Sequence, residues 1–271
     1  MISETAPDLA PPPLPFALLE FGRALGEMAS LPAAQALLRI APVGDGHAVV
    51  VCPAFMTGDS ATGLLRQFIR SRGYRVYGWE LGRNMGPATT GENQEHLAKR
   101  VTDVFRQSGR KVSLIGWSLG GVLARELAKR MPDRVRQVIT LGSPLGIDPR
   151  STRVNWVYRR IGDTPIPEEG IAEILAGVRT PPKQVPSTAI FSKTDGIVPW
   201  RGCIEPKGQL TDNIEVFSSH CGLGVHPFVF YAVADRLALP ENGWAPFDRN
   251  ASSWRRVAYP SSGHCYDVNG K

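Results

Sequence analysis

The sequence predicts an α/β fold: a mostly parallel sheet of about six strands flanked by helices. Short runs of β-branched residues alternate with helical patterns from residue 47 onward, which is typical of strands joined by crossover helices. The 28 glycines and 23 prolines lie mainly where these segments end. They are therefore turn residues rather than parts of a low-complexity tract.

Local sequence patterns predict the elements along the chain. Residues 1–15 hold five prolines and no apolar period, which predicts an extended arm. Residues 16–40 are helical, with a break near Pro32. The expected strands are 47–52, 74–79, 111–115, 135–141, 187–191 and 214–217. The expected helices between and after them are 62–72, 92–107, 118–131 and 227–237.

Residues 143–186 interrupt this alternation, because a plain connection is rarely so long. The stretch contains several arginines, the aromatic residues Trp156 and Tyr158, and a helical pattern over 168–178. We interpret residues 145–186 as a helical cap or lid inserted into one domain that spans residues 16–271. A chain of 271 residues is long enough to bury a large core without disulfides or metals.

Composition narrows the function classes. The charged fraction of 21% and the hydrophobic fraction of 42% are those of an ordinary globular protein. The net charge is +6, but the sequence contains no nucleic-acid-binding motif, so nucleic acid is not an expected partner. The longest apolar run, 48–56, is about half a membrane span, and no signal peptide is evident, which predicts a cytoplasmic protein. Without a metal-ligand cluster or a phosphate loop, we expect no metal and no cofactor.

The motif that carries chemistry is Gly116-Trp117-Ser118-Leu119-Gly120, which matches G-x-S-x-G. It follows the expected strand 111–115 and opens the expected helix 118–131, as a nucleophile elbow requires. Small flanking residues let the backbone approach closely, and the helix N-terminus favours a developing oxyanion. Ser118 is the predicted nucleophile.

A serine nucleophile needs a base and an acid that orients the base. In proteins with this motif the acid follows the serine along the chain, and the histidine base follows the acid. His220 comes just after the last expected strand, whereas His226 begins a helix and His264 lies in an irregular tail. Asp195 lies in the loop after strand 187–191, before Gly196. Asp212 is the runner-up for the acid and Asp148 a weaker alternative. We therefore predict the triad Ser118, His220 and Asp195.

The surrounding residues complete the hypothesis. Oxyanion-hole donors are expected at the backbone N–H of Leu119, after the nucleophile, and of Phe55, in the loop after the first strand. Five aromatic or apolar side chains could line an acyl pocket or belong to the plain core: Phe55, Met56, Trp117, Trp156 and Tyr158.

Cys203 and Cys221 lie in the acid loop and directly after His220, in loops that must meet if the triad forms. A disulfide between them would fix both catalytic loops. The missing signal peptide favours reduced thiols instead, so the alternative of two free cysteines stays open.

The chain resembles the α/β-hydrolase superfamily over about residues 46–240, through VVVCPAF, GYRVYGW, LIGWSLGG, LGSPLG, KTDGIVPW and SSHCGLG. It looks most like bacterial lipase and esterase members, including those related to GPI inositol-deacylases. The resemblance implies a Ser118–His220–Asp195 triad and hydrolysis of carboxylic esters. Ala54 and Trp117 depart from residues common in the family, so acyl-chain preference cannot be transferred.

The predicted function is a serine-dependent carboxylic ester hydrolase that acts on a small-molecule or lipid ester through an acyl-enzyme. One alternative is other chemistry on the same fold, by an acyltransferase, thioesterase, lactonase or perhydrolase. A second is a ligand-binding member without turnover. A third is peripheral contact with a membrane or an anionic substrate through the arginines of the lid.

Overall fold

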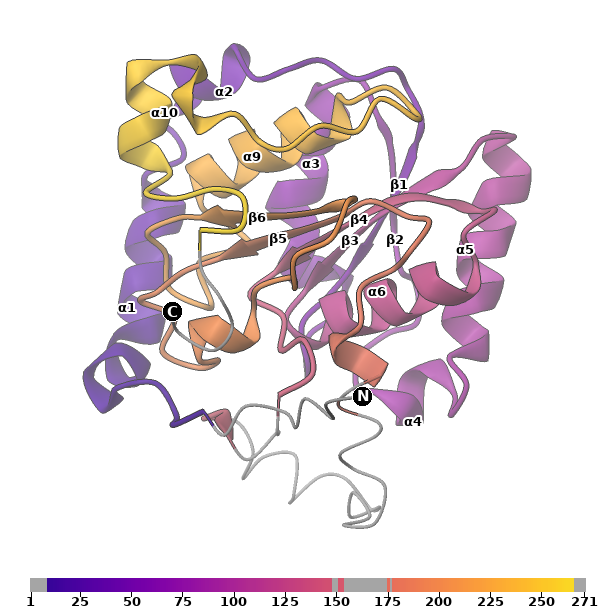
Figure 1. Ribbon diagram of the computed structural model, residues 1–271, viewed down its shortest axis with the longest axis horizontal. Helices are drawn as coiled ribbons and strands as arrows, with labels where there is room; N and C mark the ends of the chain where they lie inside the picture. The colour runs from indigo at the N-terminus through magenta and orange to yellow at the C-terminus, as the bar shows by residue number, and fades with distance from the viewer. Residues whose placement is uncertain (1–8, 148–150, 154–174, 176, 266–271) are drawn as a thin grey trace.

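The computed structural model describes residues 9–147, 151–153, 175 and 177–265 (Figure 1). Six parallel strands form one sheet in the order β2-β1-β3-β4-β5-β6. The strands are β1 (Ala48–Cys52), β2 (Arg75–Gly78), β3 (Val112–Trp117), β4 (Val135–Leu141), β5 (Ser187–Phe191) and β6 (Thr211–Glu215). The predicted α/β sheet is confirmed.

Helices cover both faces of the sheet. They are α1 (Leu14–Ala29), α2 (Gln35–Arg39), α3 (Gly63–Ser71), α4 (Pro87–Thr90), α5 (Glu95–Ser108), α6 (Leu119–Arg130), α9 (Pro227–Leu237) and α10 (Ser253–Ala258). Alternate residues of β1 enter different cores: Val49 and Val51 join side chains of α3 and α9, whereas Val50 joins those of α5 and α6. Burial of each such valine contributes about 1.5–3 kcal/mol. Both faces are thus apolar, as in most parallel sheets.

Most elements lie where the sequence predicts them, and the last strand is the exception. The sequence predicts it at 214–217, but β6 runs over Thr211–Glu215. Asp212 and Asn213 look like turn residues, yet both are buried in the strand. Asp212 accepts the N–H of Phe247 and the Asn213 amide bonds the backbone of Glu205, so the sheet tolerates both polar side chains.

The predicted lid falls largely outside the described residues. Trp156 and Tyr158 lie in the stretch 154–174, and Asp148 lies in 148–150, neither of which the structure describes. Among the helices that are described, none combines the length and the apolar character needed to cross a bilayer.

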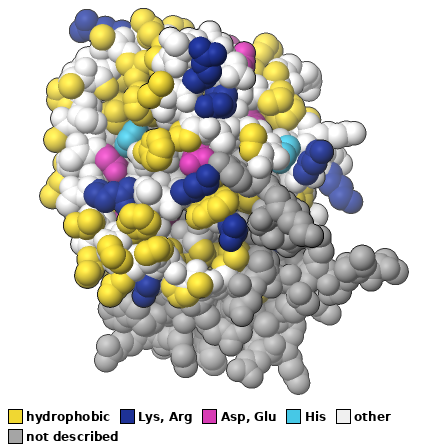
Figure 2. All heavy atoms as spheres, turned by 60° about the vertical axis from the view of Figure 1, so that its left-hand side comes forward, with side chains coloured by type: hydrophobic (Ala, Val, Ile, Leu, Met, Phe, Trp, Pro, Cys, Tyr) yellow, Lys and Arg dark blue, Asp and Glu magenta, His cyan; other side chains and the backbone are white. Residues whose placement is uncertain are grey.

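The N-terminal helix α1 packs on the domain with a polar face, whereas surface helices usually bury their apolar face. Its one buried side chain is Glu20, which is 1% exposed. Phe16 is half-buried, and the other large hydrophobic residues of the helix are exposed: Leu14, Leu18, Leu19, Phe21, Leu25 and Met28. Figure 2, which turns the α1 side of the molecule forward, shows hydrophobic side chains spread over this face. Apolar burial therefore does not explain how α1 is attached to the domain.

Candidate active site

Ser118 stands at the junction of β3 and α6 with φ 52° and ψ −122°. A positive φ is strained for a residue with a Cβ and is held only by its surroundings. The backbone N–H of Ser118 donates to the carbonyl of Leu141 at the end of β4, at 2.8 Å. The sharp turn at the carboxyl edge of the sheet is the geometry of a nucleophile elbow.

Three glycines allow the elbow to close. A Cβ on Gly116 would lie 2.2 Å from the Cα of Gly121, and a Cβ on Gly121 would lie 2.0 Å from the Oγ of Ser143. A Cβ on Gly120 would lie 2.4 Å from the carbonyl oxygen of Pro53. The N-terminus of α6 thus packs backbone against backbone on the end of β1, which only glycine permits.

His220 and Asp195 form a buried pair beside the elbow. The Nδ1 of His220 lies 2.6 Å from the Oδ2 of Asp195, and the residues are 5% and 3% exposed. The other carboxylate oxygen accepts the backbone N–H groups of Ile197 and Val198, both at 2.8 Å. Because the carboxylate accepts these bonds, Nδ1 carries the imidazole proton, and Nε2 is the nitrogen that can take a proton from a hydroxyl.

The charges around His220 favour its protonated form. Burial acts to lower the pKa of His220, but the charge of Asp195, the hydrogen bond to it and the charge of Glu20 raise this pKa above its ordinary value. The imidazolium that forms when His220 accepts a proton is therefore stabilised.

The end of β4 links the elbow to the buried pair. Gly142 follows Leu141, the acceptor of the Ser118 N–H, and has φ 57°. A Cβ on Gly142 would lie 3.1 Å from the Nδ1 of His220 and 3.3 Å from the Oδ2 of Asp195. The structure thus brings the three predicted triad residues to one edge of the sheet.

The predicted oxyanion loop is held by a residue that the sequence did not single out. The amide of buried Asn84 donates to the carbonyl of Pro53 at 2.7 Å, and its backbone carbonyl accepts the N–H of Met56 at 2.8 Å. This bond occupies the N–H of Met56, and the assignment of an oxyanion donor to Phe55 stays a prediction. Leu119 is the first residue of α6, so its N–H has no acceptor within the helix.

Of the residues predicted to line an acyl pocket, Phe55, Met56 and Trp117 lie in the described part of the chain. Met56 is 40% exposed in a left-handed turn with φ 61°. Trp117 has a contact that the sequence did not indicate, because its indole N–H donates to the carbonyl of His220 at 3.1 Å. Trp156 and Tyr158, as noted, fall within the stretch that the structure leaves out.

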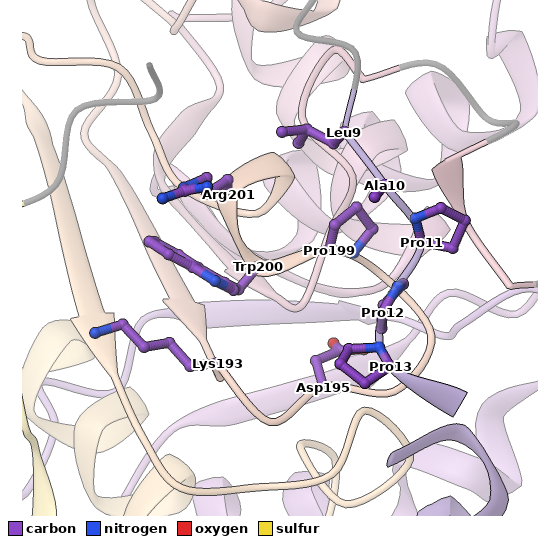
Figure 3. Close-up of a pocket in the computed structure, with 10 residues that line it drawn as sticks. All are labelled: Leu9, Ala10, Pro11, Pro12, Pro13, Lys193, Asp195, Pro199, Trp200 and Arg201. Atoms are coloured by element: carbon purple, nitrogen blue, oxygen red, sulfur yellow. The ribbon is translucent and has the colours of Figure 1, made fainter. Parts of the chain in front are cut away.

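A pocket of about 200 Å³ lies between residues 9–13 and the loop that carries Asp195. Figure 3 shows residues 9–13 along one wall, with Lys193, Trp200 and Arg201 across from them and Asp195 at one end. Neither Ser118 nor His220 lines it, so it is separate from the nucleophile.

The hypothesis of a Cys203–Cys221 disulfide is wrong, because both cysteines are free. Cys203 is buried in an apolar cluster, where burial raises the pKa of its thiol well above the ordinary value. Burial and the charge of Glu20 raise the pKa of Cys221 to about 12. The two loops do meet, but groups other than sulfur join them.

The remaining candidates have structural partners elsewhere. His226 accepts the N–H of Phe228 and caps α9. His264 bonds the backbone carbonyl of Thr211, and Asp212 lies inside β6. Among the residues that the structure covers, no three His, Cys, Asp or Glu side chains are grouped so that they could hold a metal ion.

Comparison with known proteins agrees with this architecture. The model of the thioesterase domain family matches residues 64–194. A pimeloyl-(acyl-carrier protein) methyl ester esterase of Aliivibrio salmonicida is 46% identical over 43 residues, which are 16% of this chain and 16% of that protein. The match thus spans about a sixth of that relative's length.

Solved structures extend the likeness to the whole fold. The mature lipase of Bacillus licheniformis superposes with a TM-score of 0.55 at 15% identity, covering 73% of this chain and 95% of that one. Lipase B of Aspergillus fumigatus superposes with a TM-score of 0.58 at 18% identity, covering 79% and 56%. The chain thus has the α/β-hydrolase fold. The closer relation to GPI inositol-deacylases stays a prediction.

Proposed function

We propose that the protein is a serine hydrolase that cleaves carboxylic esters through an acyl-enzyme on Ser118. One observation carries the proposal. A serine with φ 52° at the start of α6 shares the sheet edge with a buried His220–Asp195 pair whose Nδ1 and Oδ2 atoms are 2.6 Å apart. Nucleophile, orienting acid and base follow one another in the chain order expected of this fold.

In the first step, Ser118 Oγ attacks the ester carbonyl carbon while Nε2 of His220 takes the hydroxyl proton. The backbone N–H groups of Leu119 and Phe55 are the proposed donors to the carbonyl oxygen as it becomes an oxyanion. Each such donor contributes about 3 kcal/mol in comparable sites. The tetrahedral intermediate then collapses, and the C–O bond to the alcohol breaks as His220 returns the proton to the leaving oxygen.

In the second step, a water molecule loses a proton to His220 and attacks the acyl-enzyme carbonyl. Collapse of the second intermediate releases the carboxylic acid and restores the Ser118 hydroxyl. Asp195 stabilises the imidazolium in both steps and keeps the proton of neutral His220 on Nδ1.

Hydrolysis of thioesters is the second candidate, because the thioesterase domain family matches residues 64–194. The same attack and proton transfers apply, with a thiol as the leaving group in place of an alcohol. The small curated match is named as a methyl ester esterase, which favours the oxygen ester.

A substrate panel tests both candidates. Matched acyl chains are offered as p-nitrophenyl esters, methyl esters and thioesters to the wild type and to Ser118→Ala. We expect ester cleavage in the wild type and a loss of several orders of magnitude in the variant. Preference for the thioester would favour the second candidate, whereas equal rates in both proteins would contradict the serine mechanism.

A further inference from the structure

The polar face of α1 lies against the two loops that carry His220 and Asp195. Glu20, Arg23 and Glu27 follow one another at spacings of three and four residues, so they share one face of the helix. Arg23 donates to the carbonyl and the hydroxyl of Thr194, next to Asp195, at 2.6 and 2.7 Å. Glu27 accepts the N–H of Ser219, next to His220, at 2.7 Å.

Glu20 bonds both loops at once. One carboxylate oxygen accepts the N–H of Gly196 at 2.7 Å and the N–H of His220 at 3.1 Å. The other accepts the N–H of Cys221 at 2.9 Å. These three donors are the residue after the acid, the base itself and the residue after the base. Glu20 thus bonds both loops, in addition to the direct bonds between them, which run from the Thr194 hydroxyl to the carbonyl of Ser218 and from the N–H of Ser218 to the Ser192 hydroxyl.

Both loops contain a glycine where α1 approaches. A Cβ on Gly196 would lie 2.4 Å from the backbone carbonyl carbon of Phe16, and a Cβ on Gly222 would collide with the carboxylate of Glu27. The Asp195 loop thus approaches the backbone of the helix, whereas the loop after His220 leaves room for the carboxylate of Glu27.

A buried carboxylate is costly unless hydrogen bonds satisfy it. Three backbone N–H donors do so here, and hydrogen bonds to a charged acceptor are stronger than those to a neutral one. Since most of the large hydrophobic side chains of α1 are exposed, these polar contacts hold the helix on the catalytic loops together with the close approach of Phe16 to Gly196.

We propose that Glu20 is a positioning residue, whose buried carboxylate holds the Asp195 loop and the His220 loop in the geometry of the triad. This inference rests on the proposed function, because that function gives the pair its catalytic role. Glu20 joins the two loops that the predicted Cys203–Cys221 disulfide would have joined.

The carboxylate also acts on His220 through its charge. The charged groups packed around this imidazole are Asp195 in the acid loop and Glu20 on α1, with Arg23 and Glu27 bonded to the flanking residues. Glu20 contributes to the raised pKa of His220, whereas Glu27 is not among the groups that do so. The two acids of α1 therefore differ in a measurable way.

Glu20→Gln tests the proposal, because it keeps the shape and removes the charge. The amide can accept two of the three N–H groups but presents a donor to the third. We expect kcat for a short p-nitrophenyl ester to fall by about tenfold or more, since small misplacements of catalytic groups are costly. We also expect the pKa of His220, measured by NMR of the imidazole and from the acidic limb of kcat/KM, to fall, because the charge of Glu20 is one of the causes that raise it.

Glu27→Gln is the matched control, with the same change on the same helix. It should leave the pKa of His220 at the wild-type value and lower kcat less than Glu20→Gln does. Glu20→Asp keeps the charge but shortens the reach, so it should retain the raised pKa and still lose kcat. Thermal unfolding of each variant separates these effects from loss of fold.

Two results would overturn the proposal: a Glu20→Gln enzyme with wild-type kcat and His220 pKa, or equal effects of Glu20→Gln and Glu27→Gln on both. If Glu20→Gln does not fold, wild-type kcat in Glu20→Asp would overturn it instead. A wild type without Ser118-dependent hydrolysis would refute the proposed function. The NMR pKa of His220 would then still report the effect of Glu20.

Discussion

Ser118 and the His220–Asp195 pair are held in place by different means. The elbow is built within residues 116–121, where glycines let α6 pack on β1 and no side chain is ionisable. The pair depends on Glu20, which lies 200 residues before His220 in the chain. One half of the proposed site is local and steric, and the other is long-range and electrostatic.

This difference explains what each half requires of the sequence. The elbow needs small residues at fixed spacing, so a short motif encodes it. The pair needs two loops brought together by a third segment, so no local pattern encodes it. Substitutions should therefore act by crowding at the elbow and by lost bonds or charge around the pair.

The largest effect is expected for Asp195→Asn. Its amide oxygen can still accept the N–H groups of Ile197 and Val198, so the loop should fold. Its NH2 group would face His220 and favour the tautomer in which Nδ1 has no proton. We expect kcat for a short ester to fall by about 10⁴-fold with little change in the thermal midpoint. A loss below tenfold would show that Asp195 does not orient the base.

Gly120→Ala should disrupt the packing of the elbow around Ser118. Its Cβ would lie 2.4 Å from the carbonyl oxygen of Pro53, so the elbow or the oxyanion loop must shift. We expect about a 100-fold loss of kcat and about 1–3 kcal/mol less free energy of unfolding. Gly22→Ala in α1 is the control, because its Cβ meets open space, and it should stabilise the protein by about 0.5–1 kcal/mol. Equal stability changes in the two variants would refute the packing argument.

Trp117→Phe tests the link between the halves. It removes the N–H that donates to the carbonyl of His220 at 3.1 Å. Such a bond contributes about 0.5–1.5 kcal/mol, so we expect kcat to fall by roughly fivefold. Steady-state kinetics on a short and a long ester would check this result. A change confined to the long ester would instead place Trp117 in the acyl pocket.

The smallest effect on activity is expected for His226→Asn, whose readout is stability against pH. Burial lowers the pKa of His226 to about 4, and the ring accepts the N–H of Phe228, which requires the neutral form. Between pH 6.5 and 4 the unfolded chain binds a proton at this residue that the folded chain does not, so stability falls as pH falls. Unfolding at pH 7 and pH 5 should show this loss in the wild type, up to about 2 kcal/mol from His226.

His226→Asn keeps a good helix cap and should reduce this pH dependence. The same pH dependence in both proteins would show that His226 is not the titrating group. The raised pKa of His220 acts with the opposite sign, because its proton is bound more tightly in the folded state.

Sequence reasoning was sufficient where structure is local. β4, β5 and α9 lie at the predicted residues, because apolar runs and the turn residues that bound them define their ends. It failed for β6, where Asp212 and Asn213 are polar but find buried partners from distant segments.

In the candidate site too, features set by local sequence were predicted and those set by distant segments were missed. The motif around Ser118 and the order of acid and base led to residues that the structure brings to one sheet edge. Glu20 was missed because the apolar residues of α1 predict the opposite burial of that helix. The disulfide prediction recognised that the two loops meet but not what joins them.

The most direct test of the account is the site of covalent modification by a fluorophosphonate, a reagent that labels activated serines. The wild type and Ser118→Ala are treated, and intact mass and peptide mass spectrometry locate the adduct. We expect one adduct per chain, on Ser118, which is absent in the variant and forms more slowly in Glu20→Gln. An unlabelled wild type, or an adduct that persists in Ser118→Ala, would contradict it.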